Sequence, residues 1–67
     1  MNTTDIGFEI RRRRFALGLD QRALSELSGV ALHTLSNIEG GSGNPTVSTL
    51  AKLLDALGME LNVRIKT

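Results

Sequence analysis

Leu32, His33, Ser36 and Asn37 share one side of a helix if residues 32–39 are helical, because positions three and four apart lie on the same face. In the major groove of DNA an asparagine amide can bond bidentately to adenine, and an imidazole can donate or accept at a purine edge. An exposed leucine can contact a thymine methyl group. Residues 28–38 include no acid, so this face could approach a polyanion without repulsion. The alternative is that His33 is simply an exposed helix residue that contacts no base.

A second group of residues could contact the phosphates of a nucleic-acid backbone. Gln21 begins a predicted helix, where its amide and the free N–H groups of the first turn suit an anion, although helix initiation alone would also explain it. Residues 11–14 are four consecutive arginines in a chain whose net charge is only +1 and whose acids are scattered. Arg11 and Arg12 are therefore candidate phosphate contacts, and a solvated helix face is the alternative.

The residue types predict neither catalysis nor a bound cofactor or metal. His33 is the only histidine, cysteine is absent, and no pair of carboxylates shares a helix face near His33. The glycine-rich segment 40–45 is not followed by Gly-Lys-Ser/Thr, so it predicts a helix C-cap and a tight surface loop rather than a nucleotide-binding loop. We therefore expect a protein that is not an enzyme.

The length of 67 residues predicts one small domain, which can bury roughly 60% of its unfolded surface. Without cysteine there is no disulfide to stabilise so small a core, and oligomerisation remains the common alternative. The sequence offers no apolar stretch of membrane-spanning length and no signal-peptide pattern at its N-terminus. We expect a soluble cytoplasmic protein that does not enter a membrane.

Apolar spacing predicts four helices, which must position these side chains: residues 5–17, 21–28, 32–39 and 47–57. Asp20 and Thr46 are suitable N-caps, and Gly18, Gly40 and Gly58 suit helix ends. Gly29 can take the positive φ that turns the second helix into the third, and Val30 can fill the angle between them. The residues expected to face the core are Ile6, Ile10, Leu17, Leu19, Leu24, Leu27, Leu35, Ile38, Val47, Leu50, Leu53, Leu54 and Leu57.

In the C-terminal segment, apolar residues recur at every second position instead of at helical spacing. Apolar side chains alternate with polar ones at Met59, Leu61, Val63 and Ile65, which predicts a half-buried strand. A single strand leaves backbone groups unpaired, and pairing with its own copy across a two-fold axis would satisfy them. An extended tail on its own helices is the alternative. We thus expect a helical domain at 5–58 and a dimerisation strand at 59–66.

Arg14 and Glu39 stand at the ends of the first and third predicted helices. If these helices cross, the two side chains can form a partly buried ion pair that fixes the crossing angle. Arg14 would then be structural rather than a phosphate contact.

Together these residues resemble the phage-repressor-like (Cro/cI or XRE-type) helix-turn-helix family over about residues 10–57. The matching positions are Arg14, Gly18-Leu19, Gln21, Leu24, Gly29-Val30, Thr34-Leu35-Ser36, Ile38-Glu39, Gly41, Asn44-Pro45 and 50–57. The resemblance implies an all-α, lambda-repressor-like bundle that binds an operator as a dimeric repressor. It also implies base reading by Leu32, His33 and Asn37. Phosphate contacts are implied for Gln21, Thr34 and the Gly40-Gly41 loop, and a structural pair for Arg14 with Glu39.

Several positions depart from the family pattern. Ala31 replaces a capping Ser or Thr, and polar Arg13 and Ser28 replace apolar residues. Asn37 and Gly40 stand where the family often has arginine and asparagine. These changes weaken the expected contacts with the DNA phosphate backbone. One copy of the chain would then bind DNA weakly, so operator binding would depend on two copies binding together.

The C-terminal strand makes the chain most similar to HipB-type antitoxins, whose strands pair across the dimer. That resemblance implies an autoregulating repressor of a toxin–antitoxin operon, with a HipA-like kinase toxin as a further partner and an inverted-repeat operator in double-stranded DNA. Two alternatives stay open. One is a protein-interaction module with this fold that binds a partner protein instead of DNA. The other is a subunit whose tail docks on a larger protein and never self-associates.

Overall fold

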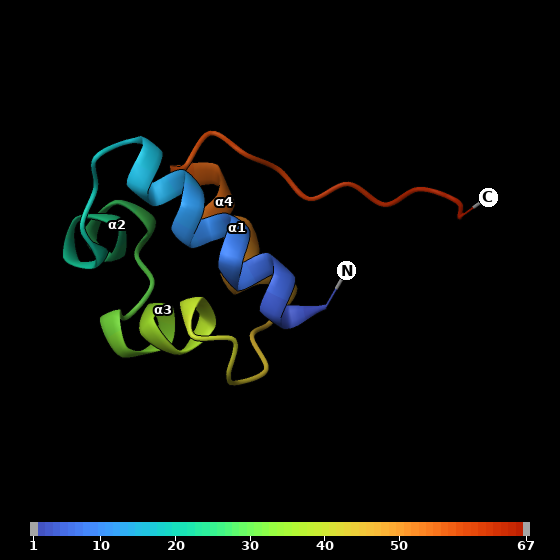
Figure 1. The fold of residues 1–67 in the computed structure, drawn as a ribbon, viewed down its shortest axis with the longest axis horizontal. Coiled ribbons are helices and arrows are strands. Elements are labelled where there is room, and N and C mark those ends of the chain that lie inside the picture. Colours follow the sequence, from blue (N-terminus) through green and yellow to red (C-terminus); the bar gives the residue numbers. More distant parts are fainter. Residues whose placement is uncertain (1, 67) are drawn as a thin grey trace.

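The computed structural model describes residues 2–66 and contains four helices: α1 (Thr3–Ala16), α2 (Gln21–Ser28), α3 (Leu32–Glu39) and α4 (Val47–Ala56). α3 packs against α1, and α2 packs against both α3 and α4 (Figure 1). The described residues therefore form the predicted all-α bundle. None of the described helices is both long and apolar enough to cross a membrane.

Local side-chain caps explain where three of the four described helices begin. α1 begins two residues before the predicted start, because the Asn2 side chain accepts the Asp5 N–H and Asp5 accepts the Asn2 N–H in return. Asp20 accepts the Ala23 N–H at 2.7 Å and Thr46 accepts the Thr49 N–H at 3.0 Å, so both predicted N-caps are present. Ala31 provides no side-chain cap for α3.

The turn between α2 and α3 has the predicted conformation. Gly29 takes a φ of 75°, and its N–H donates to the Ser25 carbonyl oxygen at 2.9 Å. The Ser25 hydroxyl donates to the Val30 carbonyl, and the Ser28 hydroxyl accepts the Val30 N–H at 3.2 Å. Val30 is buried. Ser28 thus stabilises the turn, which explains a serine where an apolar residue was expected.

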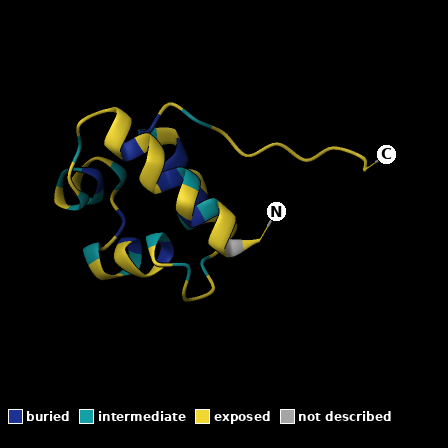
Figure 2. Ribbon diagram, viewed as in Figure 1, coloured by how far each residue is buried: buried dark blue, intermediate teal, exposed yellow. Residues whose placement is uncertain are grey.

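The buried residues gather where the described helices meet (Figure 2). The hydrophobic core that they form is entirely aliphatic. Its buried side chains are Ile10, Leu24, Val30, Leu35, Ile38, Leu50, Leu53, Leu54 and Leu57. Ile6, Leu19 and Met59 pack against its edge.

Three predicted core positions are wrong, because periodicity shows which face is apolar but not how far neighbouring helices cover it. Leu27 is 64% exposed: a three-residue step rotates it about 60° from Leu24, and the short α2 buries only the narrow row around Leu24. Leu17 is exposed as the C-cap after α1, where the chain leaves the helix. Val47 is exposed as the first residue of α4.

Gly7 lets α1 and α3 approach closely. A Cβ at this buried position would collide with the Ile38 carbonyl oxygen near the end of α3. The packing thus requires a glycine in the middle of a helix, despite the conformational entropy that glycine loses there.

The C-terminal segment 59–66 runs away from the bundle without regular secondary structure (Figure 1). The Met59 N–H donates to the Leu54 carbonyl oxygen at 2.8 Å, and Met59 with Leu61 lines a hollow beside Ile6. Beyond it, Val63 and Ile65 are exposed, so the tail does not pack along its whole length on its own helices. No strand occurs within the described segment 59–66, and the dimerisation strand stays a prediction.

Candidate nucleic-acid interface

The outer face of α3 presents polar side chains from a helix whose other face is fixed in the core. Leu35 and Ile38 are buried, while His33, Ser36 and Asn37 are exposed. Leu32 is half-buried at the start of the helix. The four predicted base-reading residues therefore lie on one short helix, with Leu32 the least accessible of those placed on its outer face.

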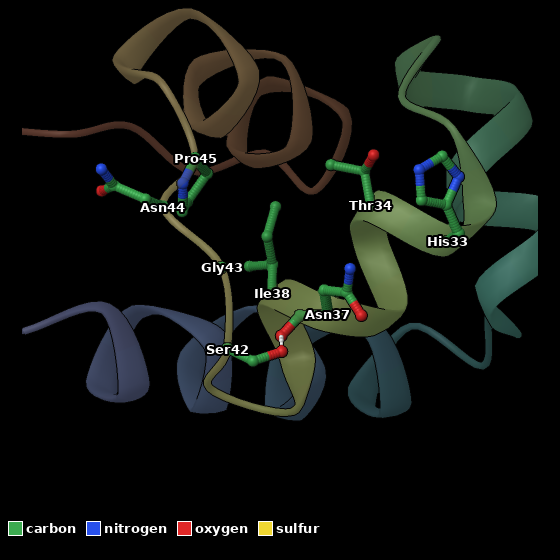
Figure 3. Close-up of a pocket in the computed structure, with 8 residues that line it drawn as sticks. All are labelled: His33, Thr34, Asn37, Ile38, Ser42, Gly43, Asn44 and Pro45. Atoms are coloured by element: carbon green, nitrogen blue, oxygen red, sulfur yellow. Dashed lines mark hydrogen bonds between the residues drawn. The ribbon is translucent and has the colours of Figure 1, made fainter.

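A surface hollow of about 190 Å³ separates α3 from the loop that follows it (Figure 3). Thr34 and Asn37 line its α3 side, and Gly43 and Pro45 line its loop side. The Ser42 N–H and hydroxyl donate to the Asn37 carbonyl oxygen at 2.9 and 3.1 Å, so the loop is held on the end of α3. The hollow can admit a polar group that contacts α3 and the loop together.

The two glycines predicted at this loop have different conformations. Gly40 has helical angles (φ −80°) and is the C-cap of α3, whereas Gly41 has a φ of 79° and makes the turn. A Cβ on Gly41 would also lie 3.1 Å from the Thr4 Oγ1 atom. Gly41 therefore lets the loop turn while it remains close to α1.

A second hollow, of about 210 Å³, lies where α1, α2 and α3 meet. Arg11, Gln21 and Ser36 line it together with the Arg14–Glu39 pair and Gly40. Gln21, predicted to contact phosphate, therefore lies beside Ser36, predicted to contact bases. Residues from three helices converge at this point.

The Arg14–Glu39 ion pair forms the floor of this second hollow. The Arg14 Nε and Nη2 atoms donate to the two Glu39 carboxylate oxygens at 2.8 Å each, and Nη1 donates to the Leu19 carbonyl oxygen at 2.8 Å. The two side chains are only 7% and 3% exposed. The hydrogen bonds to Glu39 hold the pKa of the Arg14 guanidinium above its ordinary value. Because the pair is neutral as a whole, Glu39 adds little repulsion toward a polyanion.

Gln21 is oriented by the same carboxylate. Its Nε2 atom donates to Glu39 Oε1 at 3.2 Å. An amide nitrogen carries two hydrogens, so this bond leaves one N–H for a further acceptor. The Ala23 N–H already donates to Asp20, so the N–H groups of Gln21 and Arg22 are the ones at the start of α2 that favour an anion. Gln21 at the start of α2 can therefore bind an oxyanion while Glu39 fixes its rotamer.

The four consecutive arginines lie in different surroundings and make different contacts. Arg11 lines the second hollow and also a separate surface hollow on α1, which Arg12 lines as well. Arg12 lies 3.9 Å from the Glu9 carboxylate and does not line the second hollow. The Arg13 Nε atom donates to the Leu57 carbonyl oxygen at 3.0 Å and so caps the end of α4. Arg14 is buried. Of the two predicted phosphate contacts in this block, only Arg11 lies beside Gln21.

Sequence reasoning missed the roles of Gly7 and Arg13. A glycine between Ile6 and Ile10 in a predicted helix was the available signal for a close helix approach. Arg13 gave a weaker signal, as a polar residue at a position that is usually apolar in the resembling family.

Within residues 2–66, no group of three or more His, Asp or Glu side chains is placed to hold a metal ion.

The geometry agrees with comparisons to known proteins. A helix-turn-helix family model, HTH_3, matches residues 10–63. An uncharacterised HTH-type transcriptional regulator of Haemophilus influenzae is 42% identical over 55 residues, which are 82% of this chain and 56% of the relative. The HTH-type transcriptional regulator PuuR of Escherichia coli is 43% identical over 81% of this chain and 28% of its own length.

A relative of more similar length and a solved structure agree with these matches. The HTH-type regulator y4dJ of Sinorhizobium fredii is 41% identical over 81% of this chain and 70% of its own length. The crystal structure of an HTH_3 family transcriptional regulator from Vibrio cholerae superposes with a TM-score of 0.80 at 31% identity, over 87% of this chain and 33% of that one. The chain thus spans about half of the H. influenzae relative and a third or less of PuuR and the V. cholerae protein.

Proposed function

The chain belongs to the HTH_3 helix-turn-helix family, and we propose that it is a sequence-specific DNA-binding transcriptional repressor. The observation that carries this proposal is the outer face of α3, where exposed His33, Ser36 and Asn37 project from a helix held by Leu35 and Ile38 in the core. A helix of this kind fits the major groove, and the second helix of a helix-turn-helix reads bases there.

Asn37 and His33 supply the base-edge hydrogen bonds in this proposal. The Asn37 amide suits adenine N6 and N7, and the His33 imidazole suits a purine edge. Ser36 can contact either kind of base pair. Half-buried Leu32 can contact a thymine methyl only at the entry to the groove.

Phosphate contacts come from the two hollows on either side of α3. Gln21, Arg11 and Gly40 line the hollow beside the start of α2 and bind one phosphate there. Thr34, which lines the other hollow with Ser42 and Gly43, binds another. Gly41 lines neither hollow and shapes the turn between them. Arg12 lies next to Glu9 and contributes only through longer-range charge. Such contacts fix the position of α3 in the groove but carry no sequence information.

Two copies act together in this proposal. The exposed apolar side chains at Leu61, Val63 and Ile65 would be covered if the tails of two chains paired as antiparallel strands across a two-fold axis. The two α3 helices would then read an inverted repeat, with half-sites about 34 Å apart. The same tail architecture supports the narrower proposal of a HipB-like antitoxin that also binds a HipA-like kinase toxin.

DNA selection followed by titration tests the proposal. The full chain is used to select duplexes from a random library, and the selected duplex is titrated at several salt concentrations. We expect an inverted repeat, weaker binding as salt rises, and a loss of about 1–3 kcal/mol for Asn37→Ala. Ser48→Ala truncates an exposed polar side chain on α4 that lines neither hollow, and it should bind as the wild type does. The proposal would be contradicted if no duplex sequence were selected, or if Asn37→Ala bound the selected duplex as tightly as the wild type does.

A further inference from the structure

The chain has two aromatic residues, Phe8 and Phe15, and neither belongs to its core. Phe8 is 56% exposed and Phe15 is 60% exposed. They stand seven residues apart on α1, which places them two turns apart on one side of the helix. Phenylalanine is among the residues most often buried, so an exposed pair in register on one helix indicates an interaction surface.

Arginines frame this pair of rings. Phe8, Arg11, Arg12 and Phe15 line a surface hollow of about 330 Å³, which we call the α1 aromatic patch. The Arg11 guanidinium carbon lies 5.5 Å from the centre of the Phe15 ring. Aromatic and arginine side chains are the types enriched at protein interfaces and their energetic centres.

Phe15 also has a structural contact, since the Arg14 guanidinium carbon lies 4.7 Å from its ring centre. Phe15 therefore helps to cover the buried ion pair. That contact leaves Phe15 60% exposed and does not apply to Phe8, which lies two turns away.

We propose that the α1 aromatic patch binds an acidic amphipathic helix of a partner protein. Two apolar side chains of that helix pack against Phe8 and Phe15, and its flanking carboxylates pair with Arg11 and Arg12. The contact of Arg12 with Glu9 is long, at 3.9 Å, and solvent-exposed, so it leaves Arg12 able to pair with the partner. The row from Phe8 to Phe15 spans about 10 Å along α1, which matches the i, i+7 spacing of a second helix lying along it. The patch does not include the base-reading side chains of α3, but it shares Arg11 with the second hollow, where a phosphate contact is proposed.

A second copy of the chain fits the patch poorly. A two-fold axis that paired Phe8 with the Phe15 of another copy would pass beside Arg11 and Arg12, midway along the row. Four arginines would then face one another, and that like-charge contact opposes association. Carboxylates on the partner remove this repulsion.

DNA also fits the patch poorly. Phenyl rings offer no donor to a phosphate, and their exposed faces would be buried against a polyanion. On α1, Gly7 faces α3, and Phe8 is rotated about 100° from Gly7, so the Phe8 side chain does not point at α3. The two rings therefore lie outside the proposed base contacts, and only Arg11 is common to the patch and the proposed phosphate site.

Fluorescence anisotropy with a synthetic peptide tests the site on the full chain without DNA. The probe is a labelled alanine-based helix of about 21 residues with leucines at i, i+3 and i+7 and glutamates beside them. A second peptide with lysine in place of every glutamate is the charge control. We expect the acidic peptide to bind, the lysine peptide to bind at least about tenfold more weakly, and Phe8→Ala to weaken binding of the acidic peptide at least about tenfold.

The controls separate this proposal from folding and from DNA binding. Phe8→Ala should keep the wild-type melting temperature, DNA affinity and mass in solution, because its side chain lies outside the core. Leu27→Ala removes another exposed apolar side chain, from α2, and should leave peptide binding unchanged. Absence of peptide binding, equal binding of the two peptides or equal binding by Phe8→Ala would overturn the proposal. A Phe8→Ala variant with altered DNA affinity or mass would do so too.

Discussion

Replacing Glu39 by glutamine tests how strongly the buried ion pair holds α1 on α3. The change keeps the size of the side chain but replaces one of two acceptor oxygens by an N–H donor facing the Arg14 guanidinium. Removing one member of a buried pair costs about 3–5 kcal/mol. A domain of this length is stable by about 3–10 kcal/mol at typical values per residue, so the loss is about a third of the total or more.

Thermal unfolding followed by circular dichroism measures this effect. At about 4–8 °C per kcal/mol for a domain of this size, Glu39→Gln should lower the melting temperature by at least about 12 °C. Glu26→Gln makes the same chemical change at an exposed position on α2 and should cost less than about 0.5 kcal/mol. A melting temperature for Glu39→Gln within about 4 °C of the wild type would refute the reasoning.

The double variant Arg14→Leu with Glu39→Leu separates charge from packing. Replacing both members of a buried pair by apolar residues is often nearly neutral, so the double variant should be more stable than Glu39→Gln alone.

The raised pKa of the Arg14 guanidinium, which results first from its hydrogen bonds to Glu39, predicts how stability depends on pH. A raised pKa stabilises the fold fully below the ordinary arginine value, and the stabilisation is lost only as the pH rises through the folded value. Arg14 thus stays charged between about pH 6 and pH 9, and its ionisation should contribute no pH dependence there.

Three further changes test the packing and the tail. Gly7→Ala should lower stability by about 1–3 kcal/mol or more in urea unfolding, because its methyl group would meet the Ile38 carbonyl; wild-type stability would contradict the close approach. Leu24→Ala should cost about 2–5 kcal/mol, whereas Leu27→Ala should cost less than about 0.5 kcal/mol, and similar losses would show that α2 buries both. Deletion of residues 60–67 should weaken dimers in analytical ultracentrifugation and weaken operator binding together; a wild type that sediments as a monomer would favour a tail that docks on another protein.

The sequence predicted the helices and their order because local signals agreed. Asp20 and Thr46 cap the helices expected to follow them, and Gly29 makes the expected turn. The prediction failed where the result depends on a neighbour's position, as at Leu27, since spacing within one helix does not show how far the next helix covers it. The base-reading and phosphate roles remain predictions, because a face with suitable donors becomes specific only through the ligand it meets.

The four arginines at 11–14 show why a run of charge in sequence is a poor guide to a charged surface. Consecutive residues of a helix are rotated about 100° from one another, so four in a row point to most sides of α1. Arg13 and Arg14 are used within the fold, and Arg12 lies beside Glu9, which leaves Arg11 next to Gln21. One copy therefore brings fewer cations to a phosphate backbone than the sequence indicates. Because non-specific affinity grows with each phosphate neutralised, a regulator with this surface depends on a second copy, and the proposed pairing of tails provides one.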